Sequence, residues 1–266
     1  MPSKVTVRIA ALGDLHFGRS TAPGSLQPLF SQINDSADIL ALCGDLTDYG
    51  LVDEARAVVK ELIPTVKIPI VAVLGNHDYE SGQQAEIVKV LADAGVVTLD
   101  GGTTEIHGIG FAGVKGFAGG FGRRALGSWG EEMIKTFVRE AIDESLKLES
   151  ALARLRTAQL VALLHYAPIQ ATVEGEPLEI YPFLGCSRLE DPITRFPVSA
   201  VFHGHAHHGA PEGRTRNNVP VYNVSASLMR TVFPDRPFRL IELGQTQPDA
   251  SERRAGADRR TPIEVH

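Results

Sequence analysis

The chain has 266 residues, of which 43% are hydrophobic, and 26 Lys plus Arg stand against 32 Asp plus Glu, for a formal net charge of -6. This length and composition fit one large globular domain, and the negative balance argues against strong nucleic-acid binding. Two cysteines, Cys43 and Cys186, are too few for a disulfide framework and favour a reducing compartment.

The N-terminal residues contain scattered charges instead of the apolar core of a secretory signal. Apolar runs elsewhere are shorter than a membrane span. We therefore expect a cytoplasmic protein that does not enter a membrane.

The first part of the chain alternates strands with helices. Strands are predicted at residues 5–12, 38–43 and 68–74, because each run is apolar and ends at a glycine. Helices are predicted at about residues 29–36, 52–63 and 81–94, with Pro64 closing the second. This order favours parallel pairing of the strands.

Short β-like pieces follow at residues 96–99, 103–107 and 108–112, and then a glycine-rich loop at 113–124. The loop lacks the Lys-Ser/Thr ending of a nucleotide-binding P-loop. Arg123 and Arg124 are candidate phosphate contacts, although such charges are more often solvated surface groups.

A long helix is predicted at residues 131–156, where apolar residues recur in steps of three and four and Ser145 interrupts the stripe. We favour a helix packed on its own sheet. The alternative is a projecting helix that caps an active site or forms a homodimer.

Two more buried strands, residues 160–164 and 198–202, are each followed by histidine. Between them, residues 174–191 are rich in Pro and Gly, and Tyr181 and Phe183 in this stretch are candidates for a substrate-pocket wall. Strands at 219–224 and 238–243 complete the sheets. We expect one domain over residues 1–244 and a disordered polar tail over 245–266.

Polar side chains follow five of these strands: Asp14, His16, Asp45, Asn76, His77, His165, His205 and His207. In α/β sheets, functional groups gather at the carboxyl ends of strands. Carboxylate and imidazole ligands suit Mn, Fe or Zn, and the lack of a nearby thiolate cluster argues against a structural zinc site.

Five blocks of sequence resemble those of the calcineurin-like metallophosphoesterases: Gly13-Asp14-Leu15-His16, Gly44-Asp45-Leu46-Thr47-Asp48, Gly75-Asn76-His77-Asp78, His165 and Gly204-His205-Ala206-His207. The resemblance covers about residues 5–243. It implies an α/β fold in the form of a four-layer αββα sandwich, with two mixed β-sheets flanked by helices and a dinuclear metal site at the carboxyl ends of strands.

The resemblance also implies the ligands of two transition-metal ions, Mn, Fe or Zn. The first ion would be bound by Asp14, His16, Asp45 and His207, and the second by Asp45, Asn76, His165 and His205. Between them the ions would activate a water or hydroxide for attack on phosphorus. His77 would be catalytic, stabilising or protonating the leaving oxygen.

Two carboxylates near these ligands have open roles. Asp78 is either an orienter of the His77 ring or an N-cap of the helix predicted at 81–94. Asp48 is either a hydrogen-bond partner of a ligand histidine or a cap of the helix at 52–63.

The second and third blocks differ from those of other branches of the family. The chain lacks the Arg that Ser/Thr protein phosphatases carry after the second block, and has Asp48 where purple acid phosphatases have Tyr. The blocks look more like those of bacterial phosphodiesterases, which implies a small phosphodiester substrate. A phosphomonoesterase or nucleotide pyrophosphatase is the alternative, and a non-catalytic scaffold ranks lower because every ligand position is filled.

Overall fold

The computed structural model describes residues 5–18 and 20–245 of the chain. The polar tail expected over residues 245–266 lies outside the described residues, apart from Gln245 at the end of the last strand. The disorder expected for it and the domain boundary at residue 244 stay predictions.

The first sheet has the strand order β11-β1-β2-β3-β4. Strands β1 to β4 run parallel to one another, and β11 returns from the far end of the described chain to pair antiparallel with β1. The strands are β1 (Val5–Leu12), β2 (Ile39–Cys43), β3 (Ile70–Val73), β4 (Val97–Thr98) and β11 (Arg239–Gln245).

The second sheet has the order β5-β6-β7-β8-β10-β9. Its inner strands β6, β7, β8 and β10 are parallel, and both edge strands are antiparallel to their neighbours. The strands are β5 (Gly102–Ile106), β6 (Ile109–Gly113), β7 (Gln159–Leu163), β8 (Val198–His203), β9 (Glu212–Arg214) and β10 (Pro220–Asn223).

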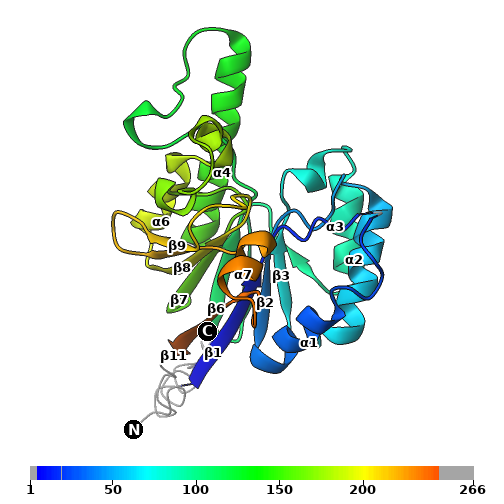
Figure 1. Ribbon diagram of the computed structural model, residues 1–266. Coiled ribbons are helices and arrows are strands. Elements are labelled where there is room, and N and C mark those ends of the chain that lie inside the picture. Colours follow the sequence, from blue (N-terminus) through cyan, green and yellow to red (C-terminus); the bar gives the residue numbers. More distant parts are fainter. Residues whose placement is uncertain (1–4, 19, 246–266) are drawn as a thin grey trace, which may run out of the picture.

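Helices cover the outer faces of the two sheets (Figure 1). Helices α1 (Gln27–Ser36), α2 (Val52–Thr65), α3 (Gln84–Asp93) and α7 (Ala226–Val232) pack on the first sheet. Helices α4 (Glu132–Arg154) and α6 (Glu190–Arg195) pack on the second. Shorter elements are η1 (His77–Tyr79), η2 (Gly122–Arg124), η3 (Gln170–Thr172), η4 (Leu178–Ile180), α5 (Tyr181–Leu184) and η5 (Ser187–Leu189).

The inner strands are apolar because both of their faces are buried. In β2, Ile39 and Ala41 point into the core between the two sheets, whereas Leu40 and Leu42 point towards the helices. This is the alternation that the pleat of a strand imposes. Phe111 and Phe202 of the second sheet meet Ile39 in the core between the sheets. The expected αββα sandwich of two mixed sheets is therefore confirmed.

Helix α4 combines the two arrangements considered for residues 131–156. Its later turns pack on the second sheet through the buried side chains of Leu148, Ala151 and Leu152. Its first turns and the loop before them rise beyond the rest of the molecule (Figure 1). Ser145, which interrupts the apolar stripe, donates a hydrogen bond to the Arg188 carbonyl at 2.6 Å. A homodimer through this helix stays a prediction.

Several boundaries differ from the sequence expectations. Helix α3 begins at Gln84 rather than near residue 81, because the turn η1 occupies residues 77–79 first. Helix α2 continues one residue past Pro64 and ends at Thr65. A proline in the last turn does not prevent the next residue from adopting helical backbone angles. Helices α6 and α7 are additional elements. In the described part of the chain, no helix is both long and apolar enough to cross a membrane.

Candidate metal centre

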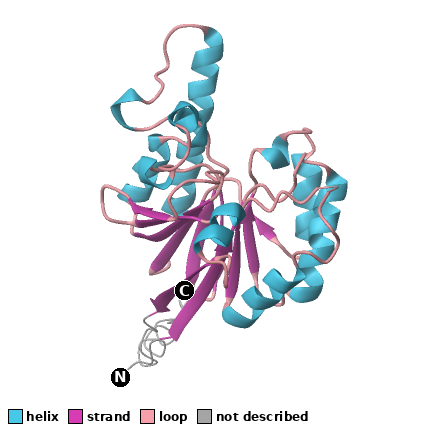
Figure 2. Ribbon diagram, viewed as in Figure 1, coloured by secondary structure: helices cyan, strands magenta, loops and turns pink. Residues whose placement is uncertain are grey.

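The eight polar side chains that follow predicted strands come from one end of both sheets. The loops that follow β1, β2, β3, β7 and β8 converge there, above the strands and between the two groups of helices (Figure 2). Parallel strands direct their carboxyl ends to the same side, so residues far apart in sequence meet. The loops after β1 and β2 are joined by the Asp14 amide, which donates to the Gly44 carbonyl at 2.9 Å, and the His16 amide, which donates to the Asp45 carbonyl at 3.0 Å.

Four of these residues have a left-handed backbone, which non-glycine residues seldom adopt. The φ angles are 56° at Asp14, 44° at His16, 50° at Asp45 and 68° at His205. Such conformations are costly and persist where the surrounding structure holds them, commonly at functional sites.

The first cluster consists of Asp14, His16 and His207. The His207 Nε2 lies 3.1 Å from an Asp14 oxygen and 3.3 Å from the His16 Nε2. The three side chains can each turn one nitrogen or oxygen to a common point, since these atoms lie within 4.8 Å of one another. This donor set fits a transition-metal ion.

The second cluster consists of Asp45, His165 and His205. The His165 Nε2 lies 3.4 Å from the Asp45 Oδ2 and 2.8 Å from the Asn76 Oδ1, so the amide oxygen joins this group. The same Asp45 oxygen lies 3.8 Å from the His16 Nε2 of the first cluster. Asp45 thus stands between two groups of ligand atoms, as a carboxylate shared by two ions must.

Backbone carbonyls orient the rings. The Nδ1 of His165 lies 3.0 Å from the Cys43 carbonyl, and the Nε2 of His205 lies 3.2 Å from the Phe183 carbonyl. An imidazole that donates its N–H to a carbonyl presents the other nitrogen to a metal, an arrangement typical of metal-binding histidines. His165 would bind through Nε2 and His205 through Nδ1.

His77 lies at the edge of the centre. Its amide donates to the Asp45 Oδ1 at 2.9 Å, and its ring centroid is 4.6 Å from that of His16. The ring Nδ1 lies 2.6 Å from the Asp48 carbonyl and 3.7 Å from a Glu80 carboxylate oxygen. The ring is therefore fixed at Nδ1, with Nε2 left for another partner.

The interpretations of Asp78 as an orienter of His77 and as a helix cap are both wrong. Its buried carboxylate accepts hydrogen bonds from the amides of Gly75 at 2.8 Å and Thr47 at 2.9 Å, and from the Thr47 hydroxyl at 2.6 Å. It therefore ties the loops after β2 and β3 together. Helix α3 begins six residues later without a side-chain cap.

Asp48 contacts both His16 and His77, through different atoms. Its side-chain oxygen lies 3.8 Å from the His16 Nδ1, and its carbonyl holds His77. The capping alternative is wrong, because Leu51 occupies the N-cap position of α2 and Glu54 supplies the side-chain contact to its amide.

Glycines make the close approach of the loops possible. A Cβ at Gly75 would overlap the Asp45 carboxylate, and one at Gly204 would overlap the Asp14 carboxylate. Any larger residue at either position would push a candidate ligand out of place.

The charges of the centre depend on one another. Burial opposes the charge on Asp45, but His165, His77 and His16 keep its pKa below the usual value. Burial likewise opposes a charged His165, but Asp45 and Asp14 outweigh it and raise its pKa to about 9. Burial, with a contribution from His165, lowers the pKa of His205 to about 3. His205 is thus neutral at pH 7, and His165 carries a proton that a bound cation would replace.

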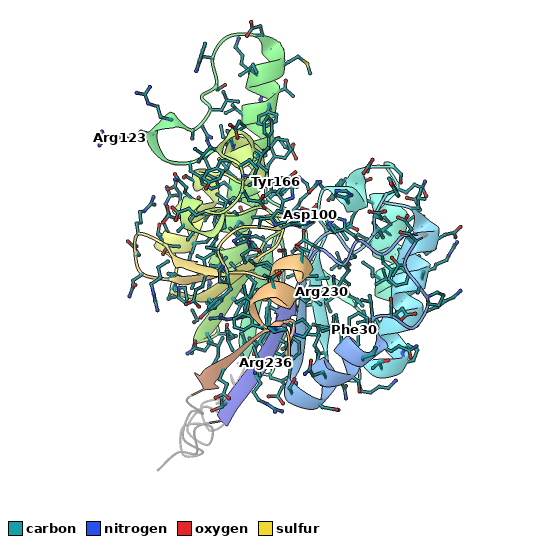
Figure 3. The ribbon with its side chains drawn as sticks, viewed as in Figure 1. Phe30, Asp100, Arg123, Tyr166, Arg230 and Arg236 are labelled. Carbon is teal, nitrogen blue, oxygen red and sulfur yellow. The ribbon has the colours of Figure 1, made fainter. Side chains whose placement is uncertain are left out.

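The candidate substrate contacts fall in two places. Arg124, Tyr181 and Phe183 line one cavity beside the centre. Arg123 lies on the projecting loop and points away from the body of the molecule (Figure 3), which contradicts a role in contacting a phosphate at this centre.

Tyr166 lies in the interior, with its ring 4.5 Å from that of His205.

Sequence reasoning missed the carbonyls of Cys43, Asp48 and Phe183 and the ring of Tyr166. A carbonyl leaves no sequence signal, because every residue has one. Tyr166 follows His165 directly, and only the fold shows that its ring covers His205.

Comparison with known protein families identifies the family to which the chain belongs. The profile described as calcineurin-like phosphoesterase matches residues 7–209, and the chain belongs to this family of phosphoester hydrolases. The family holds a dinuclear divalent metal site. The two clusters described above agree with such a site, and His16, Asp45 and His77 form a third group of possible ligands that overlaps both. Comparison with curated proteins gave no match.

Solved structures with the same fold are distant in sequence. Phosphopantetheinyl hydrolase from Mycobacterium tuberculosis superposes with a TM-score of 0.63 at 16% identity, over 88% of this chain and 95% of that one. The protein TT1561 of Thermus thermophilus gives a TM-score of 0.53 at 14% identity, over 89% of this chain and 99% of that one. At this identity the likeness speaks for the fold alone.

Proposed function

We propose that the chain is a phosphodiesterase that uses two metal ions. The observation that carries this proposal is the Asp45 carboxylate between two ligand clusters, with an apolar cavity alongside. The proposed ligands are Asp14, His16, Asp45 and His207 for one ion, and Asp45, Asn76, His165 and His205 for the other.

The positions of these ligand atoms are better explained by bound metal ions than by direct contacts among the side chains. Two imidazole Nε2 atoms lie 3.3 Å apart, and a third, on His165, lies between a carboxylate and an amide oxygen. Held by strained backbone, this arrangement is explained by cations that every one of these atoms can bind. Two divalent cations would neutralise charge on a phosphate and make water a better nucleophile at neutral pH. Nitrogen and oxygen ligands suit Mn, Fe or Zn.

His77 is proposed to handle the leaving group. Because its Nδ1 donates to the Asp48 carbonyl, a protonated ring has its second N–H at Nε2 available for the leaving oxygen. A Glu80 carboxylate oxygen lies 3.7 Å from the same Nδ1. General-acid catalysis of this kind contributes about 10² to 10⁴-fold to a rate.

The cavity favours a diester over a monoester. A phosphate diester carries two organic groups, of which one leaves beside His77 and the other needs a site of its own. The cavity lined by Tyr181 and Phe183 has a volume of about 580 Å³, within the usual range for a small-molecule site.

Turnover of two chromogenic substrates with Mn²⁺ tests the proposal. We expect bis(p-nitrophenyl) phosphate to be hydrolysed faster than p-nitrophenyl phosphate. Hydrolysis of the monoester alone would instead assign the chain as a phosphomonoesterase.

We also propose a cytoplasmic location. Cys43 and Cys186 are both buried free thiols, as expected in a reducing compartment. Fractionation of the cells that produce the protein tests this, and recovery outside the cytoplasm would contradict it.

A further inference from the structure

The cavity beside the metal centre lies under the projecting part of the molecule. Four segments form it: the glycine-rich loop and the residues just after it, one face of the early turns of α4, the start of η3, and the stretch that includes η4 and α5. Its lining residues include Phe121, Ile134, Phe137, Leu178 and Tyr181. Apolar groups therefore come from every side of the cavity.

The wall of the cavity is built onto the loops that carry candidate ligands. Phe121 and Tyr181 pack on a small buried cluster that contains Ala167 and Ala206. Ala167 comes two residues after His165, and Ala206 lies between His205 and His207. The cavity and the metal centre thus share one support.

Backbone hydrogen bonds strengthen this connection. The Gly119 amide donates to the Pro182 carbonyl at 2.7 Å, and the Ala167 amide donates to the Leu184 carbonyl at 3.0 Å. Gly119 and Gly120 have φ angles of 149° and 85°, which a glycine adopts freely. This part of the glycine-rich loop is thereby held against α5.

Phe183 marks the border between the two sites. Its carbonyl lies 3.2 Å from the His205 Nε2, and its side chain lines the cavity. A phosphate held at the centre is therefore one residue away from an apolar space.

The lining also indicates what fits inside. Among the described residues that line it, Arg124 is the single charged side chain, and Gln170 and Tyr181 are the other side-chain hydrogen-bonding groups. A nucleoside would bring ribose hydroxyls and base edges that need many more partners. An aliphatic chain needs no hydrogen-bond partners, and its transfer from water into an apolar cavity is favourable.

On the basis of the proposed function, we propose that this cavity binds a long aliphatic arm of the phosphodiester substrate, on the ester group that does not leave. The substrate class is an alkyl or acyl-chain phosphodiester. The first turns of α4 act as one wall of this specificity site.

Kinetics with a series of p-nitrophenyl alkyl phosphates tests the proposal on the Mn²⁺-loaded protein. The methyl, butyl and octyl esters share one leaving group, so kcat should change little. KM should fall along the series, by on the order of tenfold or more from methyl to octyl, because each fully buried CH₂ contributes up to about fourfold. A KM that is independent of chain length, or lower for the thymidine 5′-ester than for the octyl ester, would overturn the proposal.

Leu178→Ser and Leu146→Ser form a matched pair of variants. Leu178 lines the cavity and is 74% exposed, so its replacement should not affect folding. Leu146 is 53% exposed on α4, in a separate groove with Asp100 and Lys147. Leu178→Ser should weaken the preference for the octyl over the methyl ester several-fold, whereas Leu146→Ser should keep the wild-type preference. An equal preference in both variants would contradict the assignment.

Binding of octylphosphonate and methylphosphonate, measured by calorimetry, does not depend on turnover. Tighter binding of octylphosphonate that is lost in Leu178→Ser supports the cavity even if no ester is hydrolysed, in which case only the proposed function fails. Equal affinities combined with rapid hydrolysis of the methyl ester would overturn the cavity proposal alone. A wild-type dimer that Leu178→Ser converts to monomer in sedimentation would instead assign the cavity to a second copy.

Discussion

At the residue scale, Asp45 and His77 are neighbours with different proposed tasks. The Asp45 Oδ2 faces ligand atoms of both clusters, whereas the His77 ring is fixed at Nδ1 and has Nε2 free for a substrate. Substitution should therefore separate metal binding from proton transfer.

His77→Ala is expected to keep its metal ions and lose about 10² to 10⁴-fold in kcat, the usual contribution of a general acid. Asp45→Asn should lose metal as well as activity, because the shared carboxylate is gone. Metal analysis and bis(p-nitrophenyl) phosphate turnover on the same samples check both. Full activity in His77→Ala would remove this residue from the mechanism.

Gly75→Ala tests the close contact beside Asp45. The added Cβ would overlap the Asp45 carboxylate, so we expect less bound metal and lower turnover with the fold retained in circular dichroism. Gly102→Ala is the matched control, because its Cβ would meet its neighbours at ordinary contact distances of 3.5 Å or more. Equal metal content in the two variants would contradict the importance of this contact.

His203 is a buried histidine whose protonation should affect the free energy of unfolding. It is fully buried, its Nε2 lies 2.8 Å from the Thr172 Oγ1, and burial lowers its pKa to about 4. Because the unfolded chain binds the proton more readily, stability from this group is present above pH 6.5 and lost as the pH falls towards 4.

Urea unfolding of the metal-free protein at pH 7 and pH 5 measures this effect. Between these values His203 should account for about 2 kcal/mol of the lost unfolding free energy. His203→Gln should reduce the difference between the two pH values by that amount. An unchanged difference would show that His203 does not titrate in this range.

Within α4, Glu144 anchors the helix to the glycine-rich loop that follows β6. Its side chain is 2% exposed and accepts hydrogen bonds from the Gly116 amide and the Lys147 ammonium, both at 2.7 Å. Glu144→Ala leaves both donors without this partner and should cost about 2 to 4 kcal/mol of unfolding free energy.

Glu149 on the same helix provides the control. It pairs with Arg195 at 2.8 Å on the surface, with side chains 33% and 59% exposed. Glu149→Ala should cost less than about 1 kcal/mol in the same denaturation experiment. Similar losses in both variants would argue against the anchoring role of Glu144.

The strands were predictable from the sequence because their residues are buried on both faces, which leaves long apolar runs such as residues 39–43. Their carboxyl ends, and so the set of candidate ligands, followed directly. The pairing of β11 with β1 was not predictable, since it joins residues over 200 positions apart. Nor was the role of Asp78, which depends on amides that two strand ends present to it.

At the scale of the whole molecule, metal ions should hold the two sheets together at their carboxyl ends. The proposed ligands come from the loops after β1, β2 and β3 of one sheet and after β7 and β8 of the other. Ions that bind only the folded chain stabilise it, by about 2.7 kcal/mol per site at a hundredfold excess over Kd.

Chelation should therefore lower the melting temperature of the wild type, and added Mn²⁺ should restore it. Asp45→Asn should respond much less to either treatment. Differential scanning calorimetry checks this, and a wild-type melting temperature that is indifferent to chelator would contradict a metal bridge between the sheets.

The proposed pair of metal ions supports phosphoester hydrolysis. Its most direct test is elemental analysis of the purified protein, followed by bis(p-nitrophenyl) phosphate turnover as Mn²⁺ is titrated into the chelated protein. We expect two ions per chain and turnover that rises to a plateau as the second site fills. Fewer than two ions at saturation, or turnover that is unaffected by chelation, would contradict it.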